Sequence, residues 1–136
     1  MMKIDNKEKI AELVGNIGKD NGLVSFDKDV LEKTREKNTI LYGSYLSAPS
    51  EGTSPMQSIL NQLKESTDAK VDDFQEYDLC SISILCHNAD ELTMDDLAKV
   101  QMFLSEYINP EAEVTWEYGV DDSLKPNQVR LTLVLG

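Results

Sequence analysis

The stretch of sequence that decides the fold runs from Ala89 to Gly136 and reads ADELTMDDLAKVQMFLSEYINPEAEVTWEYGVDDSLKPNQVRLTLVLG. Thr93 is a typical N-cap, and the acidic residues after it lie where the dipole of a helix favours negative charge. The apolar spacing that follows predicts a helix that ends before Pro110. Apolar residues then alternate with other residues from Ala112 to Tyr118 and from Val129 to Leu135, which is typical of β-strands. We therefore expect a helix and two strands, and we expect the strands to pair as an antiparallel hairpin.

The residues before this stretch predict a strand, a helix and a further strand. Thr39 to Leu46 and Leu79 to Cys86 have the aromatic, β-branched or alternating apolar content of strands. Between them, Ser54 is a predicted N-cap, with Pro55 at the first helical position and Gln57 completing a capping box. The order β-α-β-α-β-β predicts an α+β fold in which a four-stranded sheet carries both helices on one face.

Helices are also predicted in the N-terminal part of the chain. Asp5 to Ile17 predicts an amphipathic helix capped by Asp5, and Asp27 to about Lys37 predicts a short second helix. The apolar stripe of the first helix needs a cover, so we expect this helix to fold back on the sheet or to form a dimer. We therefore divide the chain into a helical N-terminal segment, 1–37, and an α+β domain, 38–136.

Composition limits the classes of partner. The 136 residues are 40% hydrophobic, which fits one globular domain, and the net charge is -12. Nucleic acids and anionic membranes require basic surface, so we expect neither as a partner. The sequence has no apolar run that would span a membrane and no features of a secretory signal, so we expect a cytoplasmic location. Cys80 and Cys86 lie on one face of a strand, too far apart for a disulfide, and are expected to be buried and reduced.

Several segments resemble one protein family in their order along the chain. The residues from Ala89 to Gly136 resemble the C-terminal domain of the FtsZ branch of the tubulin superfamily, most strongly at Asp90 to Ala98 and Asn109 to Gly136. Thr39-Ile40-Leu41-Tyr42-Gly43-Ser44 is similar to the family's strand end Ala-Leu-Met-Gly-Thr-Gly. The segment Gly22-Leu23-Val24-Ser25-Phe26-Asp27-Lys28-Asp29-Val30 is similar to the family loop Gly-Leu-Ile-Asn-Val-Asp-Phe-Ala-Asp-Val. In FtsZ, one subunit inserts this catalytic loop into the GTP site of its neighbour. The resemblance covers about residues 10 to 136 and implies the C-terminal domain together with the catalytic-loop region.

The chain departs from the family pattern at several positions. Ser25 stands where the family loop has asparagine, and Asp27 and Asp29 are one residue closer together than the family's acids. His87-Asn88 stands where family members have Gly-Gly. The sequence begins partway along the family's central helix, and none of its seven glycines forms a phosphate-binding loop. We therefore expect no GTP-binding domain, no cofactor and no enzymatic activity.

The candidate partner-binding residues are Ser25, Asp27 and Asp29. The resemblance implies that the two acids position water when the loop enters a partner's active site. The alternative is that Asp27 caps a helix and Asp29 is an acid of its first turn. His87 has no cysteine or acid at the spacing of metal ligands, so we expect a structural or solvent-facing role and no metal site. We expect Trp116 to pack under a helix.

Two function hypotheses follow. The first is a non-enzymatic module that docks on the nucleotide-bearing end of an FtsZ-type filament subunit and caps or modulates filaments in cell division. The second is a standalone α+β domain that forms a homo-oligomer, with the strand face of Ser81, Ser83 and Leu85 buried in the assembly, or that binds a small ligand. An independent enzyme has less support. The β-α-β-α-β-β order occurs in chorismate-mutase-like proteins only by analogy, and Arg35 and Arg130 are the only arginines available to clamp a dicarboxylate.

Overall fold

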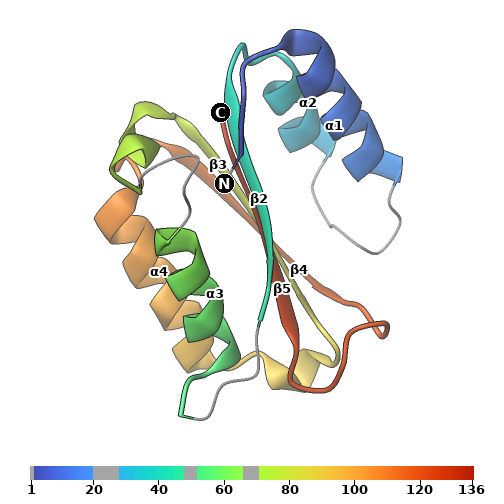
Figure 1. Ribbon diagram of the computed structural model, residues 1–136, viewed down its shortest axis with the longest axis vertical. Helices are drawn as coiled ribbons and strands as arrows, with labels where there is room; N and C mark the ends of the chain where they lie inside the picture. Colours follow the sequence, from blue (N-terminus) through green and yellow to red (C-terminus); the bar gives the residue numbers. More distant parts are fainter. Residues whose placement is uncertain (1, 20–27, 48–51, 66–70) are drawn as a thin grey trace.

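The computed structural model describes residues 2–19, 28–47, 52–65 and 71–136 (Figure 1). These residues form a mixed sheet with helices on both faces, so the α+β class is confirmed. The elements in chain order are β1 (Met2–Ile4), α1 (Lys7–Lys19), α2 (Lys28–Arg35), β2 (Ile40–Leu46), α3 (Pro55–Lys64), the 3-10 helix η1 (Val71–Glu76), β3 (Leu79–Cys86), the 3-10 helix η2 (Ala89–Glu91), α4 (Met94–Tyr107), β4 (Glu113–Val120) and β5 (Val129–Leu135).

The sheet has five strands in the order β1-β2-β5-β3-β4, one more than the predicted four. The additional strand is β1, which pairs antiparallel with β2 and aligns Lys3 with Leu41. Its three residues are too few to show an alternating pattern, which is why the sequence did not predict it. The helix that follows begins later than predicted. Asn6, not Asp5, caps α1, because its Oδ1 accepts hydrogen bonds from the backbone N–H groups of Glu8 (2.9 Å) and Lys9 (3.3 Å).

The predicted hairpin of the last two strands is wrong. β5 lies between β2 and β3 and is antiparallel to both, whereas β4 pairs parallel with β3 at the edge of the sheet. Helix α4 returns the chain to the same end of the sheet and so makes β3 and β4 parallel, as in other β-α-β crossovers. Leu133 and Val134 point to opposite faces of β5 and are both buried, because helices cover both faces of the sheet there. Alternation alone did not distinguish this central strand from an edge strand.

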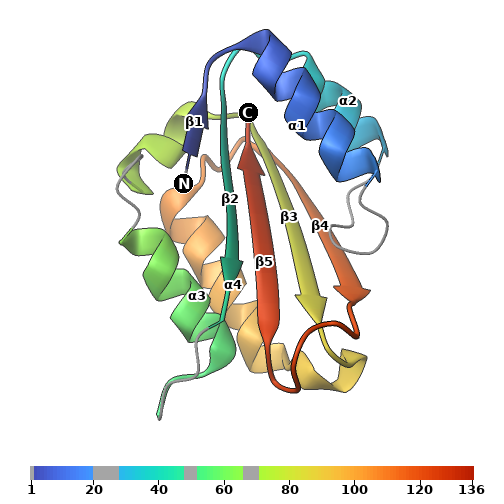
Figure 2. The same cartoon turned by 45° about the vertical axis from the view of Figure 1, so that its right-hand side comes forward.

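Helices α3 and α4 pack on one face of the sheet and enclose the main core (Figures 1 and 2). Side chains from both helices meet those of the central strands there. The fully or nearly fully buried members include Met56, Ile59 and Leu63 of α3, Val100, Phe103 and Leu104 of α4, and Ile82, Ile84, Leu131 and Leu133 of the sheet. Burying an aliphatic or aromatic side chain of this size stabilises the fold by about 1.5–3 kcal/mol. This layer is therefore the main source of stability.

Helices α1 and α2 lie on the other face of the sheet (Figure 1). Ile10 and Val14 of α1 pack against Ile40 and Val134 in a second, smaller cluster. The first helix thus folds back on the sheet, one of the two outcomes that its apolar stripe predicts. The division of the chain at residues 37 and 38 stays a prediction.

The N-termini of α3 and α4 are capped by the predicted residues. Ser54 Oγ accepts a hydrogen bond from the backbone N–H of Gln57 (3.2 Å), but the Gln57 side chain donates to Asn61 instead of closing the predicted capping box. Thr93 and Asp96 do form a reciprocal capping box, with both bonds at 3.2 Å. A cap of this kind contributes about 1 kcal/mol and stabilises the start of α4.

Candidate functional site

The three predicted partner-binding residues are only partly described by the structure. Ser25 and Asp27 lie outside the described residues. Asp29 is exposed in the first turn of α2, where the helix dipole favours an acid. This placement fits the alternative given above for Asp29. The function of the pair Asp27 and Asp29 in a partner's active site stays a prediction.

Helix α2 and the residues that directly follow it are joined to the sheet by two ion pairs. Lys33 Nζ lies 2.9 Å from Glu113 Oε1 at the start of β4, and Lys37 Nζ lies 2.7 Å from Asp78 Oδ1 just before β3. The hydrogen bond from Lys33 to Glu113 raises the pKa of Lys33, and the hydrogen bond from Lys37 lowers the pKa of Asp78. These pairs are exposed, so each is a weak contact that orients α2 more than it stabilises the fold.

A second candidate surface lies between α4 and the edge strand β4. Two adjoining hollows of about 340 and 370 Å³ share Gln101 and Trp116 as lining residues. The apolar residues that line them define what we call the α4–β4 surface: Met94, Leu97, Ala98, Leu104, Ile108, Pro110, Ala112, Val114, Trp116 and Tyr118. Met94 is 80% exposed and Tyr118 is 50% exposed. Large exposed apolar side chains that lie together mark surfaces that contact other molecules.

The sequence predicted the side of β4 on which Trp116 lies but not its exposure. Trp116 packs against the main core from beside α4, as expected, and its ring centroid lies 6.2 Å from that of Tyr118. The helix covers this edge incompletely, so Val114 and Tyr118 stay exposed on the same face. Glu113 and Glu117 alternate with these apolar residues, a pattern typical of a strand with one solvated face. That pattern indicates the two faces of the strand but does not show that β4 is an edge strand.

The α4–β4 surface lies in the most acidic part of the chain. Residues 89–122 contain one basic residue, Lys99, and ten acidic residues: Asp90, Glu91, Asp95, Asp96, Glu106, Glu111, Glu113, Glu117, Asp121 and Asp122. Their formal charge of -9 is three-quarters of the net charge of -12. Lys99 donates a hydrogen bond to Ser54 Oγ (2.9 Å) between α3 and α4. The negative potential around the α4–β4 surface therefore favours basic partners.

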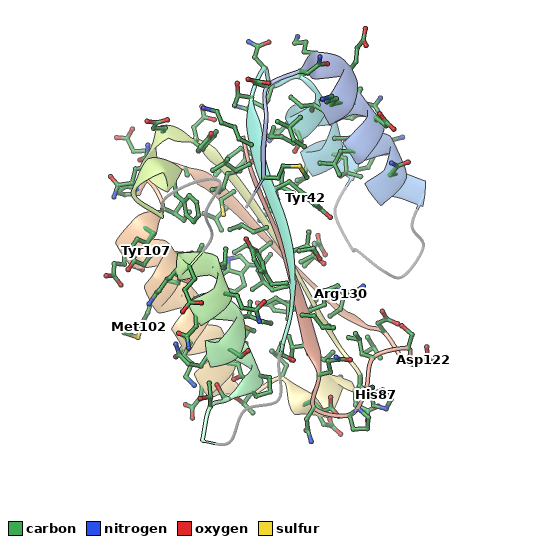
Figure 3. All side chains as sticks on the ribbon, viewed as in Figure 1. Tyr42, His87, Met102, Tyr107, Asp122 and Arg130 are labelled. Atoms are coloured by element: carbon green, nitrogen blue, oxygen red, sulfur yellow. The ribbon has the colours of Figure 1, made fainter. Side chains whose placement is uncertain are left out.

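The two cysteines and the histidine lie in environments that indicate structural roles. Burial raises the pKa of Cys80 to about 12 and that of Cys86 to about 11, so both thiols are protonated and poor nucleophiles at neutral pH. His87 Nδ1 donates a hydrogen bond to the Leu124 carbonyl oxygen (2.6 Å), in the connection between β4 and β5 (Figure 3). Among the residues that the structure describes, no three histidine, cysteine or acidic side chains are placed to hold a metal ion.

The strand face proposed for self-assembly is already buried within the chain. Ser81 and Ser83 are each 1% exposed and Leu85 is 2% exposed. They lie on the face of β3 opposite to the main core, the face on which α1 and α2 pack. A homo-oligomer of the fold would have to use another surface.

The fold is similar to that of FtsZ and TubZ. The chain superposes on an FtsZ dimer structure from M. jannaschii with a TM-score of 0.60 and 19% identity, over 85% of this chain and 32% of that chain. The type III plasmid segregation protein TubZ gives 0.61 and 18% identity, over 86% and 30%. A GTPγS-form protofilament of TubZ from Bacillus thuringiensis serovar israelensis gives 0.59 and 17% identity, over 86% and 28%. No family model matches the chain, and no curated protein sequence matches it.

These comparisons confirm the predicted resemblance at the level of the fold. The chain spans about a third of the length of the FtsZ and TubZ structures, which is consistent with a match to one domain of those proteins. In the described parts of the chain, no helix is both long enough and apolar enough to cross a membrane.

Proposed function

We propose that this chain is a non-enzymatic interaction module that binds a subunit of an FtsZ- or TubZ-type filament and caps or modulates the filament. The observation that supports the proposal is the fold: 85–86% of this chain superposes on a part of FtsZ and TubZ. TubZ itself was solved in protofilaments, in GTPγS and GDP forms. A chain with the shape of part of a filament subunit is suited to take the place of that part in a contact with the next subunit.

The loop that resembles the FtsZ catalytic loop is the proposed point of contact. In sequence it is followed directly by α2, which buries Val30 and Thr34 and is oriented by the ion pairs of Lys33 and Lys37. Thr34 Oγ1 also donates a hydrogen bond to the Val30 carbonyl oxygen within the helix (2.8 Å). Ser25, Asp27 and Asp29 are the residues that we propose to meet the partner.

The test is to add the chain below stoichiometry to polymerising FtsZ or TubZ from the same source. Filament length and GTP turnover would be followed together. We expect shorter filaments or altered turnover with the wild-type chain, and a clear reduction of that effect with Asp27→Ala. The matched control is Asp122→Ala, which removes an exposed acid far along the chain and should leave the effect unchanged. Unchanged filaments and turnover, with no co-sedimentation, would contradict the proposal.

The same protein samples can be used to test the alternative, a homo-oligomeric or small-ligand-binding domain. Its predicted assembly face is buried, and a net charge of -12 opposes self-association at low ionic strength. Sedimentation of the chain alone would show whether another surface forms an oligomer.

A further inference from the structure

The outer edge of β4 has the features of a second binding site. Figure 2 shows β4 as the outermost strand on its side of the sheet. Its eight residues pair with β3 on one side, and no strand of the described residues pairs with it on the other. Such an edge presents a row of backbone donors and acceptors to any extended segment that reaches it.

The alternation of the strand identifies which backbone groups face outward. The N–H of Glu113 donates to Asp78 O (2.8 Å) and the N–H of Asp121 donates to Cys86 O (2.8 Å), so the odd-numbered residues of β4 direct their backbone groups toward β3. The even-numbered residues therefore direct their N–H and C=O groups away from the sheet. These residues are Val114, Trp116, Tyr118 and Val120.

Three of these four residues also have exposed apolar side chains, and the fourth, Trp116, is half-buried. Val114 is 37% exposed, Tyr118 is 50% exposed and Val120 is 54% exposed, and Trp116 lines both hollows of the α4–β4 surface. Edge strands are commonly protected by proline, lysine or inward-pointing charge. β4 has no proline or lysine within it, and its outward backbone groups adjoin an apolar surface. The edge combines hydrogen-bonding capacity with apolar hollows, which is the combination used in strand addition.

The negative charge of this part of the chain indicates what kind of segment would bind the edge of β4. Residues 89–122, the segment that contains α4 and β4, carry a formal charge of -9, and Glu113 among them is paired with Lys33. Glu117 lies on the face of β4 opposite to Trp116. A second copy of this chain would bring an equally acidic edge against it, and like charges would oppose the contact. A basic segment would be attracted to the same surface. Its alternate residues would pack in the α4–β4 surface, and the others would lie beside Glu117.

We propose that the free edge of β4 binds an extended basic segment of a partner protein by strand addition. The segment alternates apolar and basic residues. The apolar ones lie against Val114, Trp116 and Tyr118, and its backbone pairs with the outward groups of β4. The inference rests on the edge of β4, its apolar side chains and the acidic charge of this segment, and it does not depend on the proposed filament function, so either can fail without the other.

Trp116 provides the signal for the test, because it is the only tryptophan of the chain and lies at the site. The probe is an acetylated and amidated peptide of alternating valine and lysine, of the same length as β4. We expect it to shift the Trp116 emission saturably and to bind more weakly as salt rises. The control peptide has the same sequence with methylated backbone nitrogens, and we expect its binding to be at least about tenfold weaker because it cannot donate to β4. A peptide with glutamate in place of lysine should not bind.

Paired variants separate the backbone contribution from the side-chain contribution. Tyr118→Ala and Tyr118→Pro both remove the ring, but only proline also removes the outward N–H, at an edge position where proline is tolerated. We expect Tyr118→Pro to bind the lysine peptide at least about threefold more weakly than Tyr118→Ala. Equal binding of the plain and N-methylated peptides to the wild-type chain would overturn the proposal, even if a variant fails to fold. A peptide-independent dimer that Tyr118→Pro abolishes would also overturn it, because the occupant would then be a second copy.

Discussion

The strands β4 and β5 both pack against β3, yet they have opposite environments. β5 lies between two strands and under helices, and Leu131, Leu133 and Leu135 are at most 2% exposed. Among the described residues β4 has one neighbouring strand, and Tyr118 and Val120 are at least 50% exposed. The apolar residues of β5 therefore stabilise the fold, whereas those of β4 are available for contact with another molecule. The difference shows that position in the sheet, more than residue type, decides what an apolar strand residue does.

The largest expected effect comes from truncating one side chain in each strand. Leu133→Ala should lower the free energy of unfolding by about 3 kcal/mol, because it leaves a cavity in the main core. Val114→Ala should lower it by less than about 1 kcal/mol, because Val114 already contacts water. Urea unfolding of both variants against the wild type measures the difference. Similar losses in the two variants would show that β4 is as buried as β5 and would remove the basis for a binding edge.

The sequence predicted most of the elements in this comparison but not their order in the sheet. Leu79–Cys86 and Val129–Leu135 are strands with the predicted bounds, and Thr93 caps α4 as predicted. The hairpin was wrong because alternation sets the faces of a strand and not its neighbours. The deciding signal was the apolar character of both Leu133 and Val134, which an edge strand does not need.

The candidate sites differ in how far the sequence could predict them. The loop with Ser25, Asp27 and Asp29 came from a resemblance, and only Asp29 lies among the described residues. The α4–β4 surface could not be predicted from the sequence. The alternating pattern predicts that Val114 and Tyr118 are core residues, and only the position of α4 shows that they are exposed. Its exposure depends on how much of β4 the helix covers, which is a property of packing and not of local sequence.

A smaller effect is expected from pH, through Cys80 on β3. Cys80 aligns with Leu135 of β5 on one side and Val114 of β4 on the other, and burial raises the pKa of its thiol from 9.0 to about 12. Because the folded pKa is higher, the stabilisation is complete below pH 9.0 and is lost as pH rises toward about 12. Between pH 8 and 10, the wild type should lose roughly 1 kcal/mol more stability than Cys80→Ala.

Urea unfolding at the two pH values, with Cys80→Ala as the reference, measures this loss. The contribution of Cys86 is present in both proteins and cancels in the difference. An identical pH dependence in the two proteins would show that water reaches Cys80. Cys80 would then be less well shielded from water on the side of β4 than the structure indicates.

The smallest expected effect concerns the contact that joins β4 to α2. Glu113 is the first residue of β4, and its carboxylate accepts two hydrogen bonds from Lys33 Nζ, at 2.9 and 3.0 Å. Both side chains are more than half exposed, so water and salt screen the pair. We expect no resolvable change in the urea midpoint for Glu113→Gln, for Lys33→Met or for the double variant. Instead, amide hydrogen exchange in α2 should become faster in all three variants, because the contact orients the helix without stabilising the core.

Exchange in β5 serves as the internal control and should not change. A loss of global stability in Glu113→Gln would mean that the β4 edge contributes to the core, and the contrast between β4 and β5 would then be one of degree.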